Sequence, residues 1–323
     1  MTRTTFGGSV LRTSRAVVLA LSLVALVLPF GAGGAQAQPL PENYNFFAGI
    51  PDELTNPGGS LPGSNDFSCK PSAEHPRPVV LVHGTGGSQQ TNWGAYVPML
   101  KNAGYCVFAL TYGAIPGAPW PISAIGGMGP IGESAAQFKT FVDRIRSSTG
   151  AQTVDVVGHS QGTIIPTYYL KQLGGEGTIT NYVSIAPPWR GLTTLGADGL
   201  PALAKRLGVP ESSIPVCQAC GEMTAESEVV KKVNAGGTPY VEGVNYTNIS
   251  TRYDEAIRLE QGQVPGPPGY NVTNIVVQDT CSQDYSEHAA IAGSRRAAYM
   301  TLNALDPAHP REVPCMFVPP FSG

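Results

Sequence analysis

The chain has 323 residues and a formal net charge of −3, and only 13% of its residues are charged. Without a basic excess, it lacks the electrostatic footprint of a nucleic-acid-binding protein. Glycine (39 residues) and proline (29 residues) are abundant, but together they stay below the share that is typical of disordered chains. Because 42% of the residues are hydrophobic, the chain can bury a substantial core, and we expect a compact globular protein.

The first residues have the pattern of a targeting segment. Three arginines precede an apolar run over residues 16–30, and an A-x-A site follows that ends at Ala37. This order is typical of a secretory signal peptide, so we predict cleavage near Ala37 and a secreted, extracellular protein. A membrane anchor is the alternative, but the run of about 15 residues is shorter than the roughly 20 that span a bilayer.

Short apolar runs alternate with helical patterns over most of the remaining chain. A Pro-, Gly- and Ser-rich stretch over residues 38–77 predicts an extended surface arm. The elements predicted after it are strands at 78–82 and 106–111, a helix at 131–148, a strand at 153–157, a helix at 161–173, strands at 181–186, 246–251 and 272–277, and a last helix at 287–305. This alternation predicts an α/β fold, in which helices cover both faces of a mostly parallel sheet. We expect one domain over residues 38–323.

Six cysteines follow the predicted signal segment: Cys69, Cys106, Cys217, Cys220, Cys281 and Cys315. An even number of cysteines in a secreted chain indicates disulfides, but six cysteines allow 15 pairings and their spacing does not choose among them. Cys217 and Cys220 form a C-x-x-C pair, which is also found in redox and zinc sites. Because no second such pair and no nearby histidine completes a zinc site, we favour a local disulfide. Acidic residues are scattered, so we expect no metal and no cofactor.

The strongest motif is Gly158-His159-Ser160-Gln161-Gly162, which fits G-x-S-x-G. It follows a predicted buried strand and opens a helix, as a nucleophile elbow does. Both glycines are needed in such a turn, because side chains at these positions would collide with neighbouring backbone. The turn exposes the Ser160 hydroxyl and directs the backbone amide of Gln161 at the position of a developing oxyanion.

A second oxyanion donor is expected from the loop after an earlier strand. The sequence His83-Gly84-Thr85-Gly86-Gly87 follows the first predicted strand, and Thr85 offers both an amide and a hydroxyl. A phosphate-binding P-loop is excluded, because that motif requires a lysine that is missing here. The dinucleotide-binding glycine pattern is also incomplete. We expect His83 and His159 to support the two turns by packing and hydrogen bonding.

A serine nucleophile needs a base and an orienting carboxylate, which follow the serine in the order acid and then histidine in this kind of fold. Only His288 and His309 come after Ser160. His288 lies shortly after the last predicted strand, whereas His309 lies in a turn beyond the last helix. We therefore predict that His288 is the base and that His309 is a surface residue.

The predicted carboxylate is Asp254, which follows the penultimate strand. Its loop would lie beside the loop that carries the histidine. Asp279 and Asp284 are the alternatives, and we expect these two to cap or stabilise the turn before His288.

Together these motifs resemble the bacterial class 2 lipases of the α/β-hydrolase fold and, more distantly, the fungal lipase B enzymes. The resemblance covers about residues 77–315 and rests on VLVHGTGG at 80–87, Trp93, GHSQG at 158–162, Tyr-Asp-Glu at 253–255 and Glu-His at 287–288. It implies the residue sets Ser160, Asp254 and His288 for a catalytic triad, Thr85 and Gln161 for an oxyanion hole, and Cys69–Cys106, Cys217–Cys220 and Cys281–Cys315 for disulfides.

By this resemblance the protein is a secreted ester hydrolase, either a triacylglycerol lipase or a carboxylesterase, that works through an acyl-enzyme on Ser160. A polyester hydrolase or a secreted acyltransferase would use the same residues, and a binding protein without chemistry is a third alternative. We expect a monomer that contacts a lipid interface transiently. Residues 113–130 and 196–208 are apolar stretches that would either line an acyl pocket, form a lid or cover the core.

Overall fold

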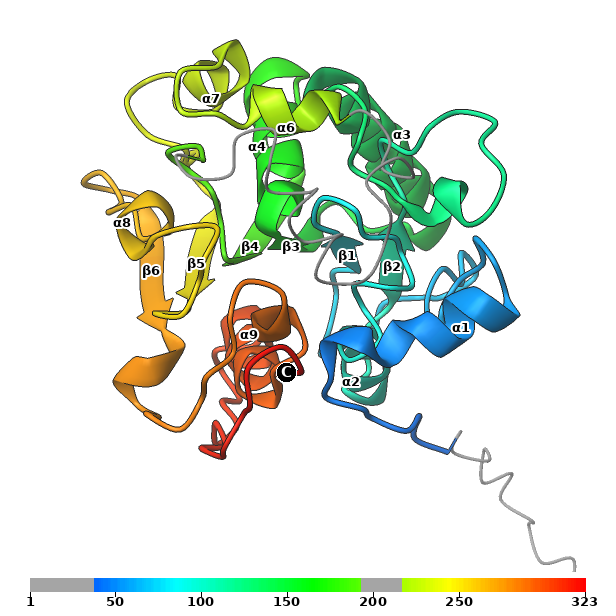
Figure 1. Cartoon of the computed structure of the whole chain (residues 1–323). Helices are drawn as coiled ribbons and strands as arrows, with labels where there is room; N and C mark the ends of the chain where they lie inside the picture. Colours follow the sequence, from blue (N-terminus) through cyan, green and yellow to red (C-terminus); the bar gives the residue numbers. More distant parts are fainter. Residues whose placement is uncertain (1–37, 193–216) are drawn as a thin grey trace, which may run out of the picture. The chain divides into compact units, whose positions relative to one another are not determined.

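A six-stranded sheet, in which every neighbouring pair of strands is parallel, organises the fold (Figure 1). The computed structural model describes residues 38–192 and 217–323. The strands are β1 (Val79–Val82), β2 (Val107–Leu110), β3 (Val154–His159), β4 (Ile179–Ile185), β5 (Asn245–Ser250) and β6 (Asn271–Val276). Their order across the sheet is β2-β1-β3-β4-β5-β6. The predicted α/β fold with a parallel sheet is confirmed, and residues 39–323 form one compact unit.

Helices cover both faces of the sheet. The α-helices are α1 (Ile50–Thr55), α2 (Tyr96–Asn102), α3 (Ile131–Thr149), α4 (Ile164–Gln172), α6 (Gln218–Glu222), α7 (Glu228–Val233), α8 (Leu259–Gly262) and α9 (Arg295–Leu305), and the 3-10 turns are η1 (Phe46–Gly49), η2 (Ile122–Ala124), η3 (Ser160–Thr163), η5 (Val277–Asp279) and η6 (Ala290–Ala292). Among these described residues no helix has the length and apolar character needed to cross a membrane.

The side chains of β1 show how the two faces differ. Val80 and Val82 belong to a buried cluster with residues of α3 and α4. Val79 and Leu81 point to the opposite face and join a second buried cluster with residues of α2 and α9. Figure 1 shows these helix pairs on opposite sides of the strands. Because both faces are covered, all four residues of β1 are apolar, as expected for a strand that is buried on both sides.

The predicted helix over residues 287–305 is wrong in its first part. The structure has the short turn η6 and then a separate helix, α9, which begins at Arg295. Ser294 has an extended backbone, and its side chain accepts a hydrogen bond from the amide of Ala297, so it caps the new helix. A Cβ atom on Gly293 would lie 2.2 Å from the backbone nitrogen of Phe46, which passes against this turn. His288 therefore lies in a loop and does not begin a helix.

The region before β1 also departs from the extended arm that the composition predicts. It contains η1 and α1, and Pro51 stands in the first turn of α1, where a missing amide hydrogen costs nothing. Glu53 of this helix is only 4% exposed. Its carboxylate accepts hydrogen bonds from Ser88 (3.1 Å), from Gln90 (2.9 Å) and from the Gly58 amide (2.9 Å). The arm is thus bonded to the loop that follows β1.

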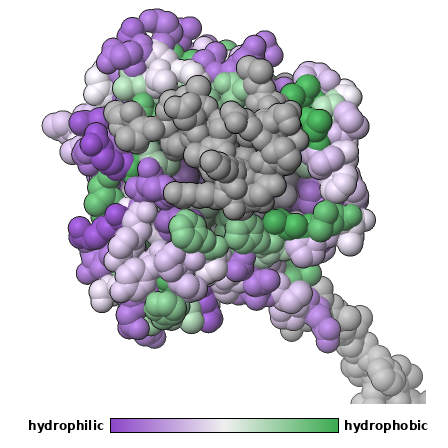
Figure 2. All heavy atoms as spheres, viewed as in Figure 1, coloured by the Kyte–Doolittle hydropathy of each residue, from purple (hydrophilic) through white to green (hydrophobic). Residues whose placement is uncertain are grey.

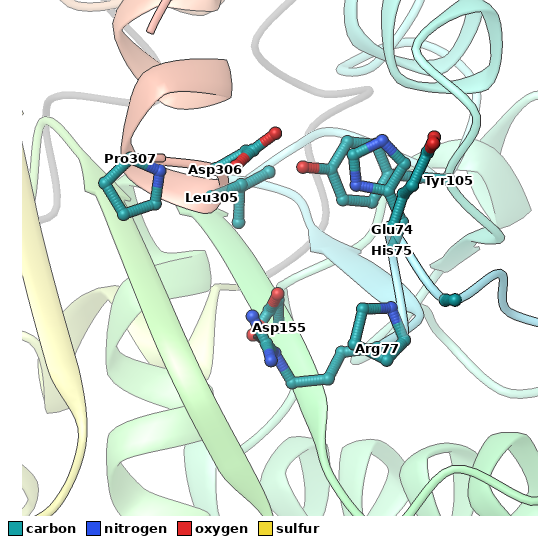
Figure 3. Close-up of a pocket in the computed structure, with 10 residues that line it drawn as sticks. Glu74, His75, Arg77, Tyr105, Asp155, Leu305, Asp306 and Pro307 are labelled. Carbon is teal, nitrogen blue, oxygen red and sulfur yellow. Dashed lines mark hydrogen bonds and ion pairs between the residues drawn. The ribbon is translucent and has the colours of Figure 1, made fainter. Parts of the chain in front are cut away.

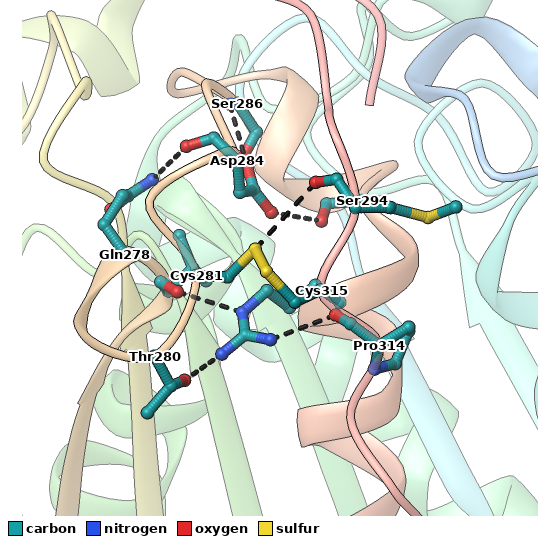
Figure 4. The surroundings of a disulfide bond; sticks show 11 residues. Gln278, Thr280, Cys281, Asp284, Ser286, Ser294, Pro314 and Cys315 are labelled. Atoms are coloured by element: carbon teal, nitrogen blue, oxygen red, sulfur yellow. Dashed lines mark hydrogen bonds between the residues drawn. A yellow bond between two sulfur atoms is a disulfide. The ribbon is translucent and has the colours of Figure 1, made fainter.

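Three disulfides join Cys69 to Cys106, Cys217 to Cys220 and Cys281 to Cys315, which are the pairs that the resemblance implies. The first connects the arm to the start of β2, and the third connects the C-terminal residues to the loop before His288. Figure 4 shows the surroundings of this third disulfide, where Pro314 and Thr280 lie beside Cys281 and Cys315. The buried Arg296 donates hydrogen bonds to the carbonyl oxygens of Val277 (2.9 Å) and Pro314 (3.0 Å).

The residues after Cys315 continue along the loop that carries His288. The Tyr285 amide donates to the carbonyl oxygen of Val318 at 2.9 Å, and the Val318 amide donates to the carbonyl oxygen of Gln283 at 3.0 Å. The Phe321 amide donates to the buried carboxylate of Glu287 at 2.9 Å. We name residues 316–323 the C-terminal strap, because they support the loop from outside.

Candidate active site

Ser160 lies in a strained turn between β3 and the helix that follows. Its φ angle is 53°, a left-handed conformation that non-glycine residues rarely adopt. The neighbouring glycines make the turn possible. A Cβ atom on Gly158 would lie 2.5 Å from the carbonyl oxygen of Gly162, and one on Gly162 would lie 2.0 Å from that of Val82. Glycine is therefore required at both positions, as in a nucleophile elbow. The Ser160 residue itself is 9% exposed.

A chain of two hydrogen bonds links Ser160 to His288 and Asp254. The Ser160 hydroxyl lies 2.9 Å from Nε2 of His288. Nδ1 of the same ring lies 2.9 Å from Oδ2 of Asp254. Because a carboxylate only accepts, Nδ1 carries the proton and Nε2 is left to accept the serine proton. Asp254 follows β5 and His288 follows β6, so parallel strands bring three distant residues to one edge of the sheet.

The carboxylate of Asp254 is held by the backbone. Its Oδ1 atom accepts hydrogen bonds from the amides of Ala256 (2.9 Å) and Ile257 (2.7 Å). These two bonds fix the orientation of the side chain and leave Oδ2 directed at the imidazole.

The other candidates have different partners. Asp279 forms an ion pair with Arg252 in which both side chains are about half exposed. Asp284 is buried and accepts hydrogen bonds from the Ser286 amide (2.9 Å) and the Ser294 hydroxyl (3.0 Å), so it stabilises the turn before His288, as we expected. The side chain of His309 is 81% exposed, which confirms its assignment to the surface.

The electrostatic surroundings favour a proton on His288. Burial lowers the pKa of its imidazole, but the charge and hydrogen bond of Asp254, with smaller contributions from Glu255 and Glu287, outweigh burial and raise the pKa above its ordinary value. The backbone amide of His288 also donates to the Glu255 carboxylate at 3.2 Å. An imidazolium that forms here is therefore stabilised by the surrounding carboxylates.

The loop after β1 is built on His83. Nδ1 of His83 donates to the carbonyl oxygen of Gly84 at 2.7 Å, and the Tyr112 amide donates to Nε2 at 3.2 Å. The two rings stack with their centroids 4.2 Å apart, and the Tyr112 hydroxyl donates to the carbonyl oxygen of His83 at 2.6 Å. Burial lowers the pKa of His83 to about 4, so the ring is neutral at neutral pH. His83 thus supports the turn, as we expected from the sequence.

Thr85 and Gln161 both lie close to Gly127. A Cβ atom on Gly127 would lie 3.2 Å from Cα of Thr85 and 2.6 Å from Oε1 of Gln161. Nε2 of Gln161 donates to the Gly127 carbonyl oxygen at 3.0 Å. The Thr85 hydroxyl is buried and has no hydrogen-bond partner within the described part of the chain. The sequence analysis did not predict that Gly126 and Gly127 pack against the loop after β1, where Gly126 exchanges backbone hydrogen bonds with Gly86 and Gly87. The only signal in the sequence is that both glycines lie in a glycine-rich stretch.

The stretch over residues 113–130 lines a cavity. Together with residues of α3 and Gln218 it encloses about 310 Å³. Its outer part carries the exposed side chains of Ile115 and Trp120, and further exposed apolar side chains lie on η1 and α1. Figure 2 shows apolar surface gathered in a band across this face. The other predicted stretch, 196–208, and the predicted signal segment, 1–37, lie outside the described residues.

Comparisons with known proteins identify the family of the chain and the fold that it shares with solved structures. The family model for class 2 lipases matches residues 76–297. A lipase B from Aspergillus fumigatus is 16% identical, with a TM-score of 0.53 over 80% of this chain and 62% of that chain. A mature lipase from Bacillus licheniformis is 14% identical, with a TM-score of 0.54 over 77% of this chain and 99% of that chain. A soluble variant of a monoglyceride lipase from Saccharomyces cerevisiae is 15% identical, with a TM-score of 0.52 over 73% and 88%.

A parallel sheet with a serine on a strained turn, next to a hydrogen-bonded histidine and aspartate, defines an α/β-hydrolase. The solved structures support this class through their fold alone, and the chain spans less than two thirds of the fungal lipase B chain that it matches. The family match covers more than half of the sequence, so the chain belongs to the class 2 lipase family. Membership of that family makes it a carboxylic ester hydrolase of the lipase type.

Proposed function

We propose that the protein is a lipase or carboxylesterase that cleaves carboxylic esters through an acyl-enzyme on Ser160. The observation that carries this proposal is the continuous hydrogen-bond chain from Ser160 through His288 to Asp254. A serine hydroxyl is a poor nucleophile at neutral pH, and this arrangement supplies both the base and the group that orients it.

In the first half of the reaction, Oγ of Ser160 bonds to the ester carbonyl carbon while Nε2 of His288 takes the hydroxyl proton. Asp254 stabilises the imidazolium. The tetrahedral intermediate then expels the alcohol, whose oxygen receives the proton from His288. In the second half, water attacks the acyl group, His288 takes a proton from this water, and the carboxylic acid leaves as the proton returns to Ser160.

The backbone amides of Thr85 and Gln161 would hold the oxyanion. Gln161 stands in the first turn after β3, where backbone amides have no partner within the helix. The buried hydroxyl of Thr85 is a third candidate donor, because it has no partner in the described residues. Donors that are fixed in advance stabilise the charge that develops in the transition state.

We further propose a secreted, monomeric enzyme that acts on lipid or other ester substrates. Disulfides at all six cysteines suit an oxidising, extracellular environment. The exposed apolar side chains on α1 and on the loop after β2 would make transient contact with a lipid interface.

The proposal is tested by labelling with a fluorophosphonate probe and by the hydrolysis of p-nitrophenyl butyrate. We expect the probe to label Ser160, and we expect Ser160→Ala to lose the label and about 10⁶-fold in kcat. Ser148→Ala, which changes a serine on α3 that donates only to a helical carbonyl, is the matched control and should keep both. A Ser160→Ala protein with near wild-type hydrolysis would overturn the assignment.

Polyester hydrolysis and acyl transfer would use the same residues. Activity on triglyceride emulsion, on solid polyester and on esters with added acceptor alcohols, measured side by side, separates the three. A series of acyl esters of increasing chain length, followed across the solubility limit, then defines the substrate class.

A further inference from the structure

His159, the second residue of the G-x-S-x-G motif, contacts two other parts of the site at once. The residue is 4% exposed. Its Nε2 atom lies 2.9 Å from the backbone carbonyl oxygen of His288. Its Nδ1 atom lies 3.0 Å from Oδ1 of Asn92, and the same oxygen accepts the amide of Gly84 at 3.1 Å. One ring therefore lies between the loop that carries His288 and the loop that leads to Thr85.

The two acceptors compete for one proton. Burial, and after it the neighbouring His288, lowers the pKa of His159 to about 3, so the ring is neutral at neutral pH and carries a single N–H group. Oδ1 of Asn92 already accepts the Gly84 amide. Within the described residues the carbonyl oxygen of His288 has no donor other than His159. The tautomer with its proton on Nε2 is therefore the more stable one, because this proton satisfies a carbonyl group that otherwise has no donor.

With the proton on Nε2, His288 is held at three points. Asp254 orients its ring through Nδ1, Glu255 accepts its backbone amide and His159 donates to its backbone carbonyl. His159 precedes Ser160 directly in the chain. Two consecutive residues thus provide the proposed nucleophile, Ser160, and the ring that binds the backbone of the proposed base, His288.

We propose that His159 is a positioning residue, whose Nε2–H group keeps the backbone of His288 at the distance from Ser160 that proton transfer requires. This inference rests on the proposed function, because it assigns the role relative to Ser160 and His288. Misplacing a reacting group by about 1 Å can cost around 10²-fold in rate. Loss of the bond should therefore lower kcat and leave KM almost unchanged.

Two substitutions separate the two sides of the ring. The amide nitrogen of His159→Gln can take the place of Nε2 and donate to His288, whereas that of His159→Asn can reach only the place of Nδ1, near Asn92. We expect the Gln variant to keep kcat within about threefold of wild type and the Asn variant to lose about 10- to 100-fold, with KM within about twofold for both. Thermal unfolding of each variant shows that it is folded. Equal kcat values for the two variants, or a better Asn variant, would overturn the inference.

A measurement on the unsubstituted protein does not depend on how the variants fold. In protein labelled with ¹⁵N at its five histidines, the nitrogen shifts of His159 at pH 7 should be those of a neutral ring with its proton on Nε2. A proton on Nδ1 would contradict the proposal. Fluorophosphonate labelling keeps the two levels apart. If wild type is not labelled at Ser160 the proposed function fails, and if it is labelled and His159→Asn reacts equally fast, only the role of His159 fails.

Discussion

A buried carboxylate lies near each end of strand β3, and the two carboxylates have different partners: Asp155 pairs with an arginine, whereas Asp254 pairs with a histidine. At its amino end, Asp155 is 1% exposed and forms an ion pair with Arg77 at 2.8 Å. At its carboxyl end, the strand leads into Ser160, whose partner is the imidazole of His288, which is hydrogen-bonded to Asp254. Figure 3 shows the amino end, where Arg77 and Asp155 lie beside a cavity of about 250 Å³.

The difference lies in where the charge of each carboxylate is balanced. The negative charge of Asp155 is compensated directly by the Arg77 guanidinium group, which stays protonated, so the charges of this pair do not change. Asp254 acts through the imidazole of His288, a group that can both accept and release a proton during the proposed reaction. Burial has the largest effect on the pKa at both ends, but it raises the pKa of Asp155, and at His288 the neighbouring carboxylates outweigh it. A buried carboxylate is thus structural beside an arginine and chemically useful beside a histidine.

Asp254→Asn gives the strongest test of this contrast. The amide can no longer hold the imidazole with its proton on Nδ1, and we expect kcat to fall by about 10⁴-fold while the unfolding temperature changes little. Hydrolysis of p-nitrophenyl butyrate and calorimetry measure the two quantities. Asp279→Asn is the matched control, because its carboxylate pairs with Arg252 at the surface. A larger loss of kcat in the Asp279 variant would make that residue the acid.

Arg77→Met breaks the other end of β3. It leaves the carboxylate of Asp155 buried without its counter-charge, which costs roughly 3–5 kcal/mol for a fully buried pair. Because the Arg77 side chain is 29% exposed, we expect a smaller loss of unfolding free energy, about 2–3 kcal/mol, and an unchanged kcat. Denaturant unfolding measures the loss.

The pH dependence of this loss follows from the pKa of Asp155. Burial already raises that pKa above its unfolded value, and removal of Arg77 raises it further. The destabilisation is therefore full at pH values above this raised pKa and shrinks as the pH falls and the carboxyl group takes up a proton. Lys139→Ala, which removes an exposed ion pair with Asp143, is the control and should cost at most about 0.5 kcal/mol at any pH. A kcat that falls with Arg77→Met would show that the two ends are coupled.

The pH dependence of kcat/KM is the smallest of the expected effects, and it tests directly whether Asp254 controls the protonation of His288. Proton acceptance requires a neutral His288, whose pKa is raised above its ordinary value of 6.5 by the nearby carboxylates. We expect activity to rise with pH through a midpoint above 6.5, and we expect Asp254→Asn to move that midpoint to lower pH in its residual activity. A midpoint that Asp254→Asn leaves in place would mean that another group controls the acid limb.

The four strands β1 to β4 could be predicted because they are buried on both faces, whereas β6, at the edge of the sheet, has no fully buried residue. Runs such as the four apolar residues of β1 have no counterpart in an exposed loop, and all six strands appear close to their predicted positions. The break before α9 could not be predicted in this way. It depends on the backbone of Phe46 passing against Gly293, a contact between residues that are far apart in the sequence.

The same limit applies to the candidate site. G-x-S-x-G at Ser160 is a local signal, because its residues are contiguous in the sequence, although only the clash at Gly158 lies within the turn and the clash at Gly162 is with Val82 of β1. The order of the chain then indicates His288 and Asp254, and the structure brings these residues together. The contact between His159 and the carbonyl of His288 spans 129 residues and involves a backbone atom, so no residue type marks it. Buried Glu53 was missed for a similar reason, since a carboxylate in a polar stretch gives no sign of being enclosed.

The C-terminal strap has a consequence for the synthesis of the protein. Ser160, Asp254 and His288 all precede it in the chain, whereas the amides and carbonyls that support the His288 loop belong to Val318 and Phe321. Translation therefore delivers the reacting groups first and their support last. A nascent or truncated chain that stops before residue 318 contains every side chain of the proposed triad and still lacks the contacts of Val318 and Phe321 to its histidine loop.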